Sequence, residues 1–199
     1  MKLVDPDGMD TFYIHLDRGR IYKQESEGNH SVQFIKNGKR IEDRTIMDIK
    51  TKINYTRGDD WPLNEGVGHT DYLEFEDAML GKNVFDIAKD ESTNSNSAKE
   101  WDYYFYKQGG GELSSSGRSD IMGHEKGRYT SQNVKGWHHF HPDNTYLSWF
   151  PSISDQERSR DLGVPSYLYN GGEVRRFDEV VRPRNLNPTE FGRIFGLCH

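Results

Sequence analysis

Residues 128–142 read RYTSQNVKGWHHFHP, which predicts a strand that carries histidines at its end. Pro142 has no backbone N–H to offer a sheet, so the strand is expected to end there. Along a strand, side chains at positions i and i+2 point to the same face. We therefore expect His139 and His141 on one face, with His138 and Phe140 on the other.

The segment that follows Pro142 carries helix and hairpin signals. Residues 154–157, SDQE, fit a capping box with Ser154 as N-cap, and Gly163 followed by Pro165 supplies a stop. Beyond this short helix, SYLYN, Gly171-Gly172 and EVRRFD predict a hairpin. Residues 187–197, NPTEFGRIFGL, predict a closing helix with Pro188 in its first turn.

Upstream of residue 128, the pattern changes from helix to strand. From Tyr72 to Ala88, apolar residues recur at helical spacing, which predicts one or two short helices interrupted at Gly81. Residues 100–107, EWDYYFYK, have the aromatic density of a buried strand that Gly109–Gly111 end. The next stretch, SSSGRSDIMGHEKGR, is expected to be a polar connection.

The first third of the chain is predicted to be β-rich. Residues 11–46 contain four segments that alternate apolar and polar side chains, which indicates a β-meander, and Asn37-Gly38 is its strongest turn signal. Residues 55–70 are rich in Gly, Asp and Pro and are expected to be a loop. We therefore predict an N-terminal extension over residues 1–60 and a second domain over residues 61–199.

Composition limits the classes of function. A net charge of -6 and a pI near 5.8 disfavour general attraction to nucleic acid. The single cysteine, Cys198, cannot form an internal disulfide. The N-terminus has no apolar segment of signal-peptide length, and no apolar run is long enough to span a membrane, so we expect neither a signal peptide nor a membrane partner.

The two histidines supply half of a zinc site. Catalytic zinc usually takes three protein N or O ligands, and Asp155, at the start of the predicted helix, can complete the set. Ser152 would then lie beside the open coordination position. A carboxylate must take the proton of the attacking water, and Glu100 at the head of the aromatic strand is our candidate, with Glu112 and Glu125 as competitors.

These residues carry a family resemblance. The order Glu100, then His139-Phe140-His141-Pro142, then Ser152-Ile153-Ser154-Asp155 resembles the signature of JAMM (MPN+, JAB-like) metalloproteases. The resemblance implies an α+β or α/β fold of the JAMM and deaminase-like style, a mixed sheet flanked by helices, here with a β-meander extension in front. It also implies zinc-dependent hydrolysis of a peptide or isopeptide bond, with Ser152 donating to the oxyanion.

A second resemblance lies at the start of the chain. The sequence VDPDG at residues 4–8 resembles the junction that ends the core of Rhs-type polymorphic toxins. Together with a JAB-like motif, it resembles the JAB-like toxin domains at the C-termini of such proteins. This implies an effector exported into a target cell, otherwise cytoplasmic, a peptide or protein substrate, and a cognate immunity protein as partner.

Two other interpretations remain open. The segment Trp137-His138-His139 resembles the W-H-H segment of HNH-type nuclease toxins, which bind a metal and cleave phosphodiesters. Thirteen residues separate His141 from Asp155, more than is usual in JAMM proteins. This spacing keeps a catalytically inactive MPN-like interaction module as the other alternative.

Overall fold

The computed structural model describes residues 10–26, 28–62, 67–93, 99–118, 127–142, 150–170 and 173–177. Several sequence features lie outside these ranges. They are the VDPDG segment, His124, Glu125, Gly171-Gly172, Cys198, residues 143–149 between His141 and Asp155, and the predicted closing helix over residues 187–197.

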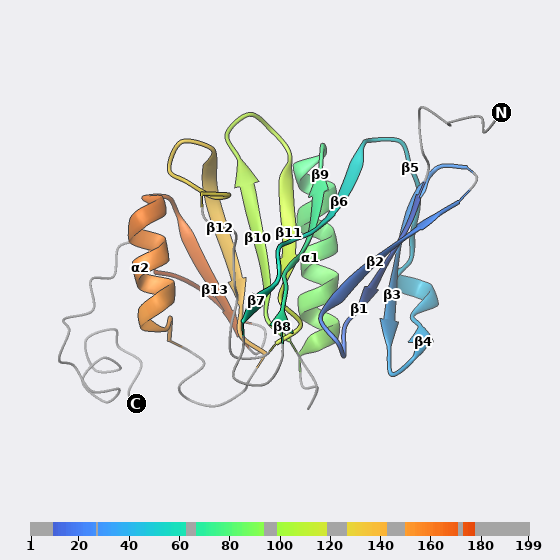
Figure 1. Cartoon of the computed structure of the whole chain (residues 1–199), viewed down its shortest axis with the longest axis horizontal. Helices are drawn as coiled ribbons and strands as arrows, with labels where there is room; N and C mark the ends of the chain where they lie inside the picture. Colours follow the sequence, from blue (N-terminus) through green and yellow to red (C-terminus); the bar gives the residue numbers. More distant parts are fainter. Residues whose placement is uncertain are drawn as a thin grey trace.

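Within the described ranges the chain is an α+β protein with mixed sheets and two α-helices (Figure 1). The first sheet has the order β2-β1-β3-β4, with β5 also paired to β3. Its strands are β1 (Asp10–His15), β2 (Arg20–Glu25), β3 (His30–Lys36), β4 (Lys39–Arg40) and β5 (Ile46–Ile49), and a 3-10 turn, η1, covers Glu42–Arg44.

The predicted β-meander is wrong in its strand order. A meander would place β2 between β1 and β3, but β1 pairs with β3 in parallel and with β2 in antiparallel orientation. The reason is burial, since β1 carries the fully buried Phe12 and Ile14 whereas four of the six β2 residues are exposed. The Asn37-Gly38 turn is confirmed, because both residues have positive φ, 53° and 71°.

The second sheet has seven strands in the order β14-β13-β12-β10-β11-β9-β6. Only β12 and β13 pair in parallel among these neighbours. The strands are β6 (Ile53–Arg57), β9 (Asp71–Phe75), β10 (Trp101–Tyr106), β11 (Gly111–Ser115), β12 (Val134–Phe140), β13 (Ser166–Asn170) and β14 (Glu173–Arg176), and a separate pair is formed by β7 (Trp61–Pro62) and β8 (Val67–Gly68).

Strands β6 and β11 of this sheet were missed by the sequence pattern. The loop predicted over residues 55–70 is wrong in part, since β6 extends to Arg57 and the short strands β7 and β8 also lie within it. Residues that we assigned to a strand end and a polar connection form β11, which lies between β10 and β9 and is buried along its whole length. Gly111 leaves no room for a side chain against the Tyr103 ring and the Tyr104 carbonyl. Small residues are therefore required there by close approach, although they lower the strand propensity that sequence analysis detects.

The helical prediction over residues 72–88 needs two corrections. Residues 72–75 belong to strand β9, and a single helix, α1 (Ala78–Ser92), then runs through Gly81 without interruption. Asp77 caps α1 by accepting from the backbone N–H groups of Met79 and Leu80. Gly81 is buried against Phe75 and Tyr103, so it permits close helix–sheet packing instead of breaking the helix.

The second helix, α2 (Ile153–Leu162), connects the parallel strands β12 and β13. A capping box is present, but it is formed by Ser152 and Asp155, two residues earlier than the pair predicted at Ser154 and Glu157. The predicted stop is confirmed, since Gly163 adopts the left-handed conformation and its N–H donates to the Ser159 carbonyl.

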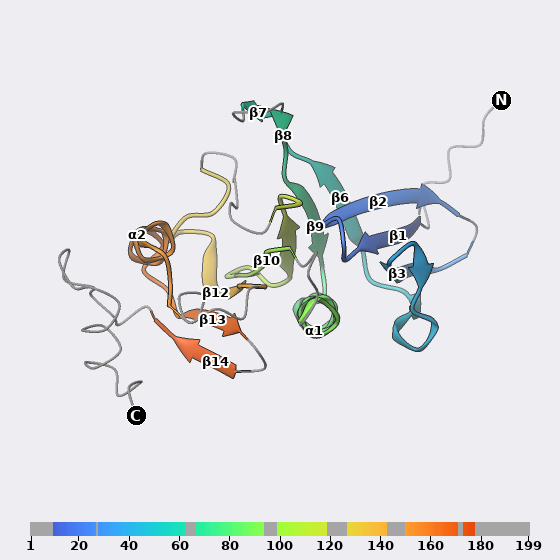
Figure 2. The same cartoon turned by 90° about the horizontal axis from the view of Figure 1, so that it is seen from below.

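Helices α1 and α2 lie on opposite faces of the seven-stranded sheet (Figure 2). On the α1 face, a single hydrophobic cluster contains Phe12, Val32 and Phe34 of the first sheet together with Phe75 and Phe85. The predicted boundary at residue 60 lies after β6, so the first predicted unit includes one strand of the second sheet. The division of the chain into two units at residue 60 stays a prediction.

Candidate metal centre

The ends of β10 and β12 bring four polar side chains to one face of the sheet. The antiparallel register places Asp102 directly opposite His139. Glu100 lies two residues before Asp102, and His141 lies two residues after His139, so alternation puts all four on the same face. The N–H of His141 donates to the Tyr169 carbonyl at 3.0 Å, which extends the pairing of β12 with β13 beyond the strand itself.

Helix α2 adds a fifth side chain to this face. Because α2 follows β12 in the crossover to β13, its N-terminus lies near the carboxyl end of β12. One carboxylate oxygen of Asp155, Oδ2, accepts from the Ser152 N–H at 2.6 Å. The same oxygen lies 3.4 Å from His141 Nε2, and Oδ1 lies 3.6 Å from His139 Nε2. The capping box thus aims Asp155 at both imidazoles.

These side chains match the donor set of a zinc site. Glu100, His139 and His141 each offer a ligand atom, and these atoms lie within 4.8 Å of one another. Tetrahedral zinc with bonds of about 2.0–2.2 Å places its ligand atoms about 3.3–3.6 Å apart. Asp155 approaches the two imidazoles with different oxygens, Oδ1 at 3.6 Å from His139 and Oδ2 at 3.4 Å from His141. His139 and His141 could therefore hold a zinc ion together with a carboxylate oxygen of either Glu100 or Asp155.

Asp102 fixes the orientation of His139. Its Oδ1 accepts from His139 Nδ1 at 2.5 Å and from Trp137 Nε1 at 2.9 Å, and the carboxylate is fully buried. A hydrogen bond at Nδ1 leaves Nε2 as the ligand atom, which is the nitrogen that faces Asp155. Sequence analysis missed Asp102. The available signal was an acidic residue inside an aromatic strand, two positions from Glu100.

The electrostatic field at His139 favours a cation. Burial by itself lowers the pKa of His139, but the carboxylates of Asp102 and Asp155 outweigh burial and raise it to about 10. Burial likewise acts to raise the pKa of Asp155, yet His139 and His141 hold it well below its usual range. A metal cation between these groups would meet the same favourable field.

Glu100 has a different protonation preference. Burial raises its pKa above the ordinary value for a glutamate, although His139 and His141 act in the opposite direction. Only 8% of the residue is exposed. A carboxyl group with a raised pKa next to a candidate zinc site has the property required of a proton shuttle at neutral pH.

Ser152 is exposed at the entrance of α2. Its Oγ accepts from the Asp155 N–H at 3.1 Å and lies 2.8 Å from Ser154 Oγ. Its structural contribution is therefore to hold Asp155. When Ser154 donates the hydrogen of that hydroxyl pair, the Ser152 O–H can donate elsewhere.

The other two candidates for the proton-accepting carboxylate, Glu112 and Glu125, are not found at this site among the described residues. Glu112 is almost completely buried and accepts from Arg128 through two hydrogen bonds of 2.9 and 2.7 Å, and also from the Tyr129 hydroxyl. It is thus committed to a structural network. Glu125 lies outside the described residues. His138 faces α1, where its Nδ1 lies 2.7 Å from the Tyr169 hydroxyl.

Comparisons with protein-family models, with curated proteins and with solved structures find no match to this chain. Across the ranges that the structure describes, no helix is long and apolar enough to cross a membrane.

Proposed function

We propose that this protein is a zinc-dependent hydrolase that cleaves an amide bond, either a peptide or an isopeptide bond. One observation carries the proposal. Glu100, His139 and His141 offer ligand atoms within 4.8 Å of one another, and Asp155 at the N-terminus of α2 lies 3.6 and 3.4 Å from the two imidazoles, although these four residues come from three separate segments. A ligand set with an additional carboxylate is the arrangement that metal-assisted hydrolysis needs.

In this proposal each residue has a distinct role. His139, His141 and Asp155 hold the metal, which when bound supplies a Lewis acid and makes water nucleophilic at neutral pH. Glu100 takes the proton of the attacking water and delivers it to the leaving amine. Ser152 donates its hydroxyl hydrogen to the oxygen of the scissile carbonyl as negative charge develops there.

The resemblance of the Glu, H-x-H-P and S-x-x-D segments to JAMM proteases supports the amide-hydrolase assignment. The VDPDG segment supports a narrower proposal, in which the chain is an effector domain exported to a target cell. Its partners would then be a peptide or protein substrate in that cell and an immunity protein in the producer.

The nuclease alternative has less support from the geometry. His138 and His139 of the W-H-H segment point to opposite faces of the sheet, one to Tyr169 and the other to Asp102. They cannot bind the same metal ion without rearrangement of β12.

Metal content tests the ligand assignment. We expect close to one zinc per chain by elemental analysis, and we expect its loss in His139→Ala and in Asp155→Ala. His138→Ala is the matched control, since it removes a neighbouring imidazole from the opposite face. Zinc retained in both ligand variants would refute the site, and zinc lost only in the control would favour the nuclease.

Growth inhibition tests the activity. Expression in bacterial cytoplasm or periplasm should slow growth, and Glu100→Gln should relieve it while zinc stays bound. Glu112→Gln is unsuitable as a control, because it breaks a buried ion pair. Glu25→Gln, which changes an exposed glutamate at the end of β2, is a better one. Inhibition that persists in Glu100→Gln, or degradation of DNA by the wild-type protein, would contradict the proposal.

A further inference from the structure

The backbone of Glu100 is held by the chain that leaves β11. Glu100 comes one residue before β10, where the regular pairing of the sheet has not yet begun. Its N–H donates to the Arg118 carbonyl at 2.9 Å, and its carbonyl accepts from Ser115 Oγ at 3.0 Å. Ser115 is fully buried, and its Oγ also accepts from the Gly117 N–H at 3.3 Å. The position of Glu100 therefore depends on where residues 115–118 lie.

The turn between β1 and β2 packs directly on these residues. A Cβ added to Gly19 would lie 2.7 Å from Lys99 Cβ and 2.8 Å from Ser115 Oγ. On the other side, a Cβ added to Gly117 would lie 2.8 Å from the Arg20 guanidinium. The two glycines thus let the turn and the β11 end approach to a distance at which no side chain fits.

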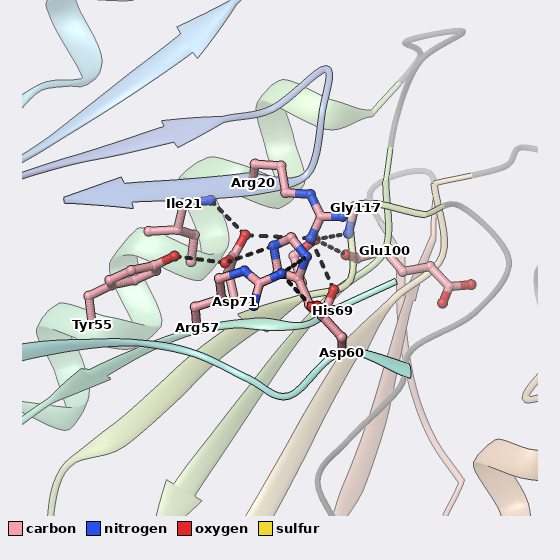
Figure 3. Close-up of polar contacts among 10 residues, drawn as sticks. Arg20, Ile21, Tyr55, Arg57, Asp60, His69, Asp71, Glu100 and Gly117 are labelled. Atoms are coloured by element: carbon pink, nitrogen blue, oxygen red, sulfur yellow. Dashed lines mark hydrogen bonds and ion pairs between the residues drawn. The ribbon is translucent and has the colours of Figure 1, made fainter. Parts of the chain in front are cut away.

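The turn is also anchored to the second sheet. Arg20 Nη1 donates to the His69 carbonyl at 3.0 Å, and the Ile21 N–H donates to Asp71 Oδ2 at 3.2 Å (Figure 3). Asp71 is buried and also accepts from the Tyr55 hydroxyl at 2.9 Å. Figure 3 shows Arg20 and Gly117 next to each other, with Glu100 on the adjoining segment. These contacts hold the first sheet against the end of the second sheet at which the candidate metal centre lies.

The geometry points to a positioning role for the β1–β2 turn. Residues 17–20 pack against Lys99, Ser115 and Gly117, and this packing determines the position of Glu100 beside the metal ligands. This inference rests on the proposed function. It assigns the N-terminal sheet a part in the site, whereas the sequence suggested a separable extension. None of the proposed ligands lies in the turn, so the role that we assign to it is exerted through the backbone of Glu100.

The test uses the full-length protein loaded with Co²⁺, whose visible absorption follows ionisation at the metal as pH changes. Glu100→Gln is the reference, because it alters the group that accepts the proton, and it should shift the midpoint of the titration. Gly19→Ala should shift the midpoint in the same direction. Gly38→Ala is the matched control, since Gly38 also has positive φ, 71° against 57°, but nothing lies within 4 Å of its added Cβ. Both alanines therefore bear a similar backbone strain.

A second pair of variants tests the same role if Gly19→Ala does not fold. Ser115→Ala removes the hydrogen bond to the Glu100 carbonyl and should shift the midpoint, whereas Ser114→Ala removes a buried Oγ that has no hydrogen-bond partner among the described residues and should not. If Glu100→Gln shifts the midpoint but Gly19→Ala and Ser115→Ala match their controls, the positioning role is refuted. If Co²⁺ does not bind, or Glu100→Gln shifts nothing, the proposed function itself fails.

Discussion

Replacing Asp102 by Asn tests how the metal centre is built. The change keeps the size of the side chain but removes the charge that faces His139 Nδ1 at 2.5 Å. An asparagine can also present its NH₂ group to Nδ1, in which case the hydrogen of the imidazole moves to Nε2. An imidazole protonated at Nε2 cannot bind the metal at the nitrogen that faces Asp155.

The expected loss of zinc affinity in Asp102→Asn follows from the general role of carboxylates that orient metal-binding histidines. Loss of a carboxylate that orients a metal-binding histidine typically weakens metal binding about 10–100-fold, or about 1.4–2.7 kcal/mol. Asp102 should lie toward the upper end, since it is fully buried and its Oδ1 also accepts from Trp137. Zinc affinity would be measured by competition with a chromophoric chelator, and thermal unfolding with excess chelator would report the metal-free stability separately.

Two controls separate orientation from charge and packing. Asp86→Asn removes an exposed carboxylate paired with Lys82 on α1, on the opposite face of the sheet, and should leave zinc affinity within about twofold. Trp137→Phe removes the second donor to the Asp102 oxygen but keeps an aromatic ring beside His139, whose ring centroid lies 5.3 Å from that of Trp137. It should weaken zinc binding less than Asp102→Asn. The reasoning is refuted if Asp102→Asn binds zinc as tightly as the wild type while His139→Ala does not bind it.

Three further predictions concern stability. Burial, and then Lys82, lower the pKa of His138 to about 3 from 6.5, so folding stability should fall as pH drops from about 6.5 toward 3. His138→Phe should make the free energy of urea unfolding, measured with metal chelated, less dependent on pH, and an unchanged pH dependence would contradict the assignment. Gly81→Ala should cost about 1–3 kcal/mol in urea unfolding despite the better helix propensity of alanine, because the methyl meets Phe75 and Tyr103; a stabilised variant would show that α1 can move away. A chain beginning at Gly66 lacks β6 and the first sheet and should aggregate without zinc, because the hydrophobic cluster around Phe85 loses the residues that the first sheet contributes. A soluble fragment that unfolds cooperatively and holds zinc would support the two-unit organisation instead.

Local sequence patterns predicted the parts of the site that depend on periodicity. Alternation along residues 134–141 placed His139 and His141 on one face and His138 on the other, and the structure has this arrangement. The aromatic strand, the Asn37-Gly38 turn and the Gly163 stop also follow from backbone preferences of a few neighbouring residues. Such features need no knowledge of distant contacts.

The capping box shows where local reasoning loses precision. Both Ser152 and Ser154 are suitable N-caps, and each is followed three residues later by an acidic side chain. The structure selects Ser152, and this choice aims the Asp155 carboxylate at both imidazoles.

Local sequence patterns thus identified the side chains that one element can present, two histidines at a strand end and an acidic residue at a helix start. Which elements lie next to each other followed from tertiary packing. The register of β10 against β12 places Asp102 opposite His139, and the packing of the β1–β2 turn against residues 115–117 connects the first sheet to Glu100. The physical reason is that register and sheet order depend on burial and close approach between residues far apart in the chain, which hydrophobic periodicity does not encode.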